Sequence, residues 1–132
     1  MLVKKPGALL VSGSKNPVFE VVMFELGATG HLSTSFVCAV DHEGISFWQG
    51  PAPALVVDLP WTAVLDISED DVEGDTRRRG ITIRVRHSPS TVTVNFAARN
   101  SDHPMMPLDS PRIAALLKLI EQARGQGSRL AD

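Results

Sequence analysis

The sequence predicts a mainly β domain, a small antiparallel barrel or pair of sheets, with one helix packed on it at the C-terminal end. Short strand-like runs, broken by Gly and Pro, fill residues 18–96, and an amphipathic helical pattern follows at residues 111–124. Strands that precede a closing helix are typical of antiparallel sheets, whereas alternating strands and helices indicate parallel ones. The 132 residues have the size of one domain, so we expect a single domain over 1–132. Residues 1–17 give no clear pattern, and residues 125–132 are expected to form a flexible tail.

Composition and charge narrow the class of protein. Hydrophobic residues make up 43% of the chain and charged residues 21%, which is ordinary for a globular protein. The net charge of −2 argues against a nucleic-acid binder, which usually has an excess of Lys and Arg. No apolar run approaches the roughly 18 residues of a membrane span. Cys38 is the one cysteine, so no intramolecular disulfide is expected and a cytoplasmic setting is predicted.

The first part of the predicted sheet is a strand followed by a hairpin. Val18–Leu26 is rich in Val and Phe and is interpreted as a strand. Leu32–Val40 and Ile45–Trp48 flank the turn Asp41–Gly44, whose glycine can take the left-handed backbone conformation. This turn sets a register that pairs Val40 with Ile45, Cys38 with Phe47, Val37 with Trp48 and Ala39 with Ser46. One face of the hairpin is then wholly apolar and is expected to face the core, with Trp48 on the other face.

Prolines divide the middle of the chain. Gln49–Pro53 interrupts the strands, because proline cannot donate to the hydrogen-bond ladder of an interior strand. Leu55–Leu59 is predicted to resume as a strand that leads into Pro60-Trp61. Val64–Ile67 is predicted to be the next strand.

A second hairpin is predicted from strict alternation of apolar and polar residues. With His87–Ser90 in the turn, the apolar pairs Val85–Val92, Ile83–Val94 and Ile81–Phe96 share one face, and the polar pairs Arg86–Thr91 and Arg84–Thr93 share the other. One dry and one wet face is the pattern of an antiparallel sheet that covers a single core.

The closing helix has signals at both ends. Ser110 is predicted to cap it, and Pro111 suits its first position, where a missing N–H is no loss. Gly125 is predicted to end it. The apolar stripe follows the spacing i, i+3, i+4, i+7 and consists of Ile113, Leu116, Leu117 and Ile120.

These elements resemble the bacterial pleckstrin-homology-like (PH-like) domains and the related GRAM-type modules. The resemblance rests on the step Leu59–Thr62 leading to Val64 and Ile67, on the Gly-Ile-Ser-Phe strand Gly44–Phe47, and on the late hairpin and closing helix. It covers residues 18–124. It implies two nearly orthogonal antiparallel sheets, with the helix plugging one open end of the barrel.

The chain departs from eukaryotic pleckstrin-homology domains in two respects. Its closing helix has no Trp, and Glu25–Ser35 has no Lys or Arg where phosphoinositide binders of that family place a basic cluster. Binding of inositol lipids is therefore not expected.

No catalytic or metal-binding motif is found. The histidines do not stand at a ligand-like spacing, and they are interpreted as exposed or structural residues: His31, His42, His87 and His103. Cys38 lies on the predicted core face and is interpreted as a small buried hydrophobe rather than a nucleophile. We therefore expect no catalytic residue, no metal and no cofactor.

The most polar stretch, residues 69–79, has two interpretations. Five acidic residues precede three arginines there, which indicates a solvated loop whose charges partly cancel. Alternatively, five guanidinium groups gather into a site for an anion or an acidic partner: Arg77, Arg78, Arg79, Arg84 and Arg86. The residues expected to face the strand arginines are Thr91, Thr93 and Asn95, so these arginines are predicted to lack salt-bridge partners.

Four apolar residues are candidates for a partner contact. Trp48 and Trp61 belong either to the core or to an exposed aromatic patch. Met105 and Met106 either cap the barrel or form an adaptable binding surface.

The function predicted from the sequence is a non-catalytic binding or scaffold module. It recognises a protein or acidic ligand through the arginine-rich face or an exposed strand edge, and self-association into a homo-oligomer belongs to this class. The alternative is a small-ligand carrier or small enzyme that uses the barrel interior. A filled apolar interior counts against the carrier, and a polar cavity with His or Asp beneath the helix counts against the scaffold.

Overall fold

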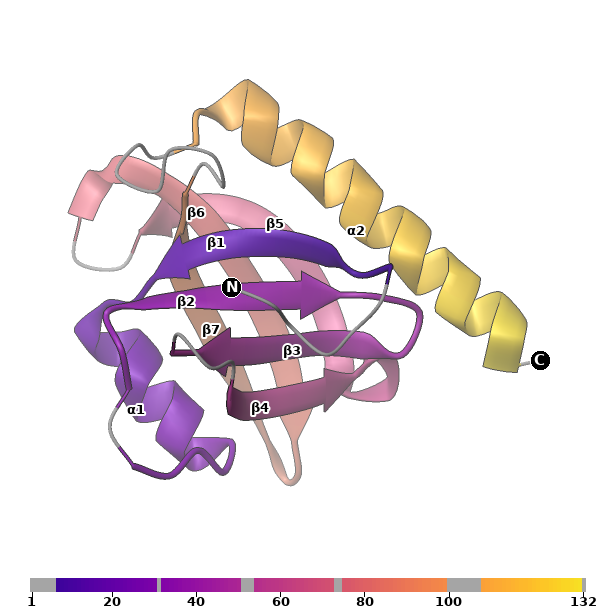
Figure 1. The fold of residues 1–132 in the computed structure, drawn as a ribbon, viewed down its shortest axis with the longest axis horizontal. Helices are drawn as coiled ribbons and strands as arrows, with labels where there is room; N and C mark the ends of the chain where they lie inside the picture. The colour runs from indigo at the N-terminus through magenta and orange to yellow at the C-terminus, as the bar shows by residue number, and fades with distance from the viewer. Residues whose placement is uncertain (1–6, 31, 51–53, 73–74, 100–107, 132) are drawn as a thin grey trace.

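In the computed structural model the described residues are 7–30, 32–50, 54–72, 75–99 and 108–131, without the side chains of 75–78 and 126–131. They form an antiparallel sheet of seven strands in the order β4-β3-β2-β1-β7-β6-β5 (Figure 1). The strands are β1 Leu9–Ser14, β2 Ser35–Val40, β3 Gly44–Gln49, β4 Ala54–Pro60, β5 Val64–Val72, β6 Asp75–His87 and β7 Ser90–Arg99. The helices are α1 Pro17–Glu25, the short 3₁₀ helix η1 Trp61–Ala63 and α2 Ser110–Ala131. The predicted mainly β fold with a C-terminal helix is confirmed.

The sheet consists of two groups of strands that β1 joins. β1 pairs with β2 along all of its six residues, but with β7 only through Ser12–Ser14. The two sheets that the resemblance implies are thus continuous here through hydrogen bonds, and the edge strands β4 and β5 are not paired with each other. The N-terminal segment, which gave no clear pattern, supplies the strand that connects the two groups. Gly13 in β1 lets the ring of Phe36 lie directly against the backbone of this strand, because a Cβ at position 13 would lie 2.6 Å from the ring.

Both predicted hairpins have the predicted register. β2 and β3 pair Val40 with Ile45, Ala39 with Ser46, Cys38 with Phe47 and Val37 with Trp48. β6 and β7 pair Val85 with Val92, Ile83 with Val94, Ile81 with Phe96, Arg86 with Thr91 and Arg84 with Thr93. The β2–β3 turn depends on Gly44, which has a φ of +155° and whose added Cβ would collide with the carbonyl of Leu59.

The prediction of a strand at Val18–Leu26 is wrong, because this segment is the helix α1. The side chain of Asn16 accepts a hydrogen bond from the N–H of Phe19 at 2.8 Å, and Pro17 follows in the first turn. Phe19, Val22 and Met23 have the spacing i, i+3, i+4 and are all buried. Capping and packing therefore override the strand propensity of the Val and Phe residues.

Helix α1 places the ring of Phe19 in the hydrophobic core that the sheet encloses. Four of the five phenylalanines in the chain form one cluster, with ring centroids between 4.6 and 6.2 Å apart in every pair: Phe19, Phe36, Phe47 and Phe96. The resemblance implied that the closing helix plugs an open end of the barrel. Helix α1 contributes a ring to this cluster, and α2 adds Ile113 and Ile120 to the same hydrophobic core.

Helix α2 lies along β5 and is tied to that strand near both ends (Figure 1). The hydroxyl of Ser110 donates to Oε2 of Glu69 at 2.6 Å, and Nη2 of Arg124 donates to the carbonyl oxygen of Val64 at 2.9 Å. Of the predicted stripe, Ile113 and Ile120 are fully buried, and Leu116 and Leu117 are partly buried against the core.

Both predicted ends of this helix need correction. The capping side chain is that of Asp109, whose Oδ1 accepts from the N–H of Arg112 at 3.1 Å, because the Ser110 hydroxyl is bonded to Glu69. Gly125 does not end the helix, which continues through the predicted tail to Ala131. Gly125 is not among the glycines with positive φ.

The continuation of α2 predicts the effect of replacing Gly125. A Cβ at this position has no atom within 4 Å, so Gly125→Ala should raise the free energy of unfolding by about 0.5–1 kcal/mol through helix propensity. Urea denaturation measures the change. The matched control is Gly27→Ala, which is equally uncrowded but has a φ of +107° and should destabilise the protein. Destabilisation by Gly125→Ala would place the end of the helix at Gly125.

Candidate functional site

The acidic and basic stretch at residues 69–79 is mostly strand rather than loop. β5 extends to Val72 and β6 begins at Asp75, so only residues 73–74 lie outside the described chain. Antiparallel pairing sets Asp71 opposite Arg79 and Asp66 opposite Arg84. The acidic and basic residues, which form separate runs in the sequence, therefore meet across two strands.

Two of the candidate arginines have carboxylate partners on β5. Arg79 binds Oε2 of Glu69 through Nε at 2.9 Å and Oδ1 of Asp71 through Nη1 at 2.5 Å. Arg84 binds Oδ2 of Asp66 through Nε at 2.6 Å and also through Nη2. The hydrogen bond from Arg84 lowers the pKa of the Asp66 carboxyl, so this acid stays ionised beside the guanidinium.

The prediction that the strand arginines lack salt-bridge partners is thus wrong for Arg84. Arg79, which was predicted to lie in the charged loop, also has acidic partners on β5. On one side of β6, β7 supplies Thr and Asn residues, and on the other side β5 supplies the acids. Arg86 is exposed near the β6–β7 turn. The backbone of Arg77 and Arg78 belongs to β6, and their side chains lie outside the described part. In that part the arginines do not converge on one anion site.

The tryptophans take part in the fold. Trp48 is buried, and its indole N–H donates to the hydroxyl of Ser46 at 2.8 Å. The indole N–H of Trp61 donates to the carbonyl of Asp41 at 2.9 Å, and the guanidinium of Arg124 lies 5.8 Å from its ring centroid. Both side chains therefore have internal partners. The other two apolar candidates, Met105 and Met106, lie outside the described residues.

The described residues place no reactive group in a catalytic arrangement. Cys38 is buried as predicted, and burial raises the pKa of its thiol to about 12. His42 and His87 are exposed, and His31 and His103 lie outside the described residues. Among the residues that the structure describes, no group of three or more His, Cys, Asp or Glu side chains could hold a metal ion.

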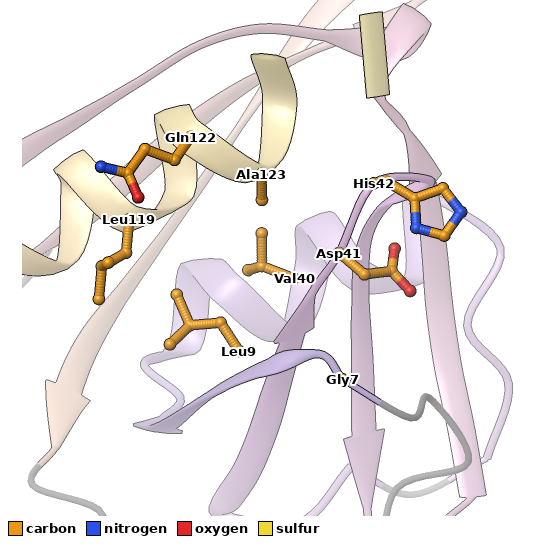
Figure 2. Close-up of a pocket in the computed structure, with 8 residues that line it drawn as sticks. All are labelled: Gly7, Leu9, Val40, Asp41, His42, Leu119, Gln122 and Ala123. Atoms are coloured by element: carbon orange, nitrogen blue, oxygen red, sulfur yellow. The ribbon is translucent and has the colours of Figure 1, made fainter. Parts of the chain in front are cut away.

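A shallow recess of about 210 Å³ lies beneath α2 (Figure 2). Its lining comes from the start of β1, the β2–β3 turn and α2, and consists of Gly7, Leu9, Val40, Asp41, His42, Leu119, Gln122 and Ala123. Figure 2 shows Asp41 and His42 on one side of the apolar pair Val40 and Ala123, and Gln122 on the other. The volume is below the roughly 300–1,000 Å³ of typical small-molecule pockets. The recess nevertheless contains Asp41 and His42 beneath α2. A His or Asp in a cavity at this place is the feature expected of a small-ligand site.

A different surface stands out on α1. Val18, Val21 and Phe24 are 44%, 59% and 44% exposed, and with Pro17 they form what we call the α1 outer face. These residues lie on the side of the helix opposite Phe19 and Met23. The helix thus has apolar residues on its exposed side as well as on its buried side, with Glu20 and Glu25 as its charged residues, and this is unusual for a surface helix. The fifth phenylalanine of the chain lies on this exposed side.

The helix that carries this face is held firmly at its start. Nδ2 of Asn16 donates to the backbone carbonyl and to Oδ1 of Asn95, at 3.1 and 3.2 Å. Nδ2 of Asn95 in turn donates to the hydroxyl of Thr82 at 3.0 Å. The ammonium of Lys15 bridges Glu20 at 3.0 Å and the carbonyl of Leu32 at 2.8 Å. The apolar face is therefore presented on a fixed backbone.

Sequence reasoning missed the α1 outer face because it assigned the segment to a strand. A signal was present in the Asn-Pro pair at residues 16 and 17, which is typical of a helix start. With apolar residues on every side, the segment has no polar stripe to reveal a helical period.

Comparison with the models of known protein families, with curated protein sequences and with solved structures finds no match to this chain. No α-helix among the described residues has the length and apolar character needed to cross a lipid bilayer.

Proposed function

We propose that the protein is a non-catalytic binding module of PH-like architecture that recognises another protein through the α1 outer face. The observation that carries the proposal is the exposure of Val18, Val21 and Phe24 on a single helix face. Burying apolar surface against a partner is favourable by about 25 cal/mol per Å². A contiguous apolar face on an otherwise well-packed domain is typical of a contact surface.

The geometry suits a helix that docks into a groove. Val18, Val21 and Phe24 recur every three residues and project from the same side of α1. The contacts of Asn16 and Lys15 fix the helix before a partner arrives, so little order remains to be gained on binding. Preorganisation of this kind lowers the entropic cost of association.

The arginine face supports partner binding less well. An anion that approached Arg79 or Arg84 would first have to displace Glu69, Asp71 or Asp66. The acidic-ligand part of the prediction therefore has less support than the protein-partner part. The cytoplasmic setting stays a prediction from the single cysteine.

A small-ligand carrier is the second candidate, and the recess beneath α2 favours it. The site would be this recess rather than the interior of the sheet, which the four Phe rings of the core occupy. Ala123→Trp should fill the recess and abolish binding of such a ligand. The same change should leave a protein contact at the α1 outer face intact.

Photo-cross-linking tests the proposed contact. With p-benzoylphenylalanine at position 21, the full chain in cells of its source organism should cross-link to a discrete protein. The control carries the same group at position 91. Thr91 is also exposed, but it lies beside the β6–β7 turn, whereas the start of α1 contacts β7 at Asn95. We expect the adduct only at position 21. Equal adducts at both positions, or none at position 21, would contradict the proposal.

A further inference from the structure

We infer that the partner of the α1 outer face is a protein with an apolar groove bordered by a Lys or Arg that meets Glu25. This inference rests on the proposed function and adds the chemistry of the partner. It follows from the charged residues of α1, which suit a basic protein partner better than a second copy of this chain or a membrane surface.

Helix α1 has two acidic residues and no basic one. Glu20 is paired with Lys15, whose ammonium lies 3.0 Å from its carboxylate. Glu25 is exposed, and in the described part of the chain no ion-pair partner is found for it. It follows Val21 by four residues and therefore lies on the same side of the helix. The α1 outer face thus carries at its edge a negative charge that has no ion-pair partner among the described residues.

A partner that covers this face removes water from the Glu25 carboxylate. Desolvation of a charged group is unfavourable unless an opposite charge or hydrogen-bond donors replace the water. A Lys or Arg beside the groove provides this compensation and also distinguishes the partner from one with an acidic rim.

A second copy of this chain meets the requirement poorly. In an antiparallel helix pair centred on Val21, Glu25 of one copy would lie against Pro17 of the other, with no cation on either helix. In a parallel pair the two Glu25 carboxylates would lie close together and repel each other. The symmetry of a homodimer therefore leaves Glu25 without compensation.

A membrane surface is also a poor match. Helices that bind in the lipid interface usually have Lys or Arg around the apolar face, which attract anionic headgroups. Helix α1 has only Glu20 and Glu25 as charged residues. The charges therefore favour a basic protein partner.

Two synthetic amphipathic helices with the same leucine stripe test the inference, one flanked by Lys and the other by Glu. Titrations followed by calorimetry and by amide NMR shifts should show that the wild-type chain prefers the Lys peptide by roughly threefold to fivefold, as expected for an exposed ion pair. Glu25→Lys should reverse the preference. The control Glu121→Lys makes the same change of charge at an exposed position of α2 and should retain the preference.

The variants separate failure of the inference from failure of the proposed function. A preference for the Lys peptide that persists in Glu25→Lys would overturn the inference, as would no binding of either peptide to the wild-type chain. If Val21→Asp binds both peptides as the wild type does, the α1 outer face is not the site and the proposed function fails too.

A dimer in sedimentation that Val21→Asp dissociates would identify a second copy as the occupant. Flotation with phosphatidylcholine–phosphatidylglycerol vesicles, lost in Val21→Asp, would identify a membrane. Either result would overturn the basic protein partner.

Discussion

Phe47→Ala should lower the free energy of unfolding by about 3–5 kcal/mol, the range for deleting a buried aromatic ring. The side chain of Phe47 is 1% exposed, and its ring centroid lies 5.6–5.9 Å from those of Phe19, Phe36 and Phe96. These three rings come from α1, β2 and β7, so no single element can move to fill the space. The cavity should therefore remain largely open, which places the effect in the upper part of the range.

Urea denaturation followed by Trp fluorescence measures this effect, since the chain has two tryptophans. The matched control is Phe24→Ala, which deletes the same ring from the exposed side of α1, where the side chain is 44% exposed. We expect that change to lower the stability by less than about 1 kcal/mol. Equal effects of the two substitutions would mean that the inner and outer sides of α1 are assigned wrongly.

The two hairpins could be predicted to the residue because their alternation and their turns agree. In β6 and β7 the alternation places Ile83 and Val94 on the core face, and a slip by one residue would place Arg84 there. The turn before Gly44 sets the β2–β3 register in the same way, since the φ of Gly44 suits glycine alone.

The remaining parts of the fold depend on contacts between distant residues. The partners of Arg79 and Arg84 follow from the pairing of β5 with β6. This pairing is not evident from the sequence, because a run of charged residues indicates a loop. Ser110 is a good capping residue locally, but Glu69, 41 positions earlier, takes its hydroxyl. Gly125 resembles a helix end in sequence, and the helix nevertheless continues beyond it.

The candidate site was harder to predict than the fold. Local propensity favours a strand at Val18–Leu26, whereas the cap at Asn16 and the burial of Phe19, Val22 and Met23 favour a helix. Once it is a helix, Val21 and Phe24 necessarily lie on the side away from Phe19. The exposed apolar face of α1 therefore follows from the helical structure of the segment and not from its local propensity.

Val21→Asp tests the central claim, that the α1 outer face binds a protein, most directly. Val21 is 59% exposed, so the substitution should change the urea midpoint little. At the centre of a contact it would bury an unpaired carboxylate in place of an apolar group, which is expected to cost about 2 kcal/mol or more. The affinity for the purified protein that cross-links at position 21 should then fall by about thirtyfold or more.

Calorimetric titration of that protein into the wild-type, Val21→Asp and Thr91→Asp chains is the measurement. The account predicts that Val21→Asp loses affinity while it keeps the wild-type stability, and that Thr91→Asp, an equal change of charge on an exposed strand residue, keeps both. An affinity of Val21→Asp equal to that of the wild type would contradict the claim that this face is the contact surface.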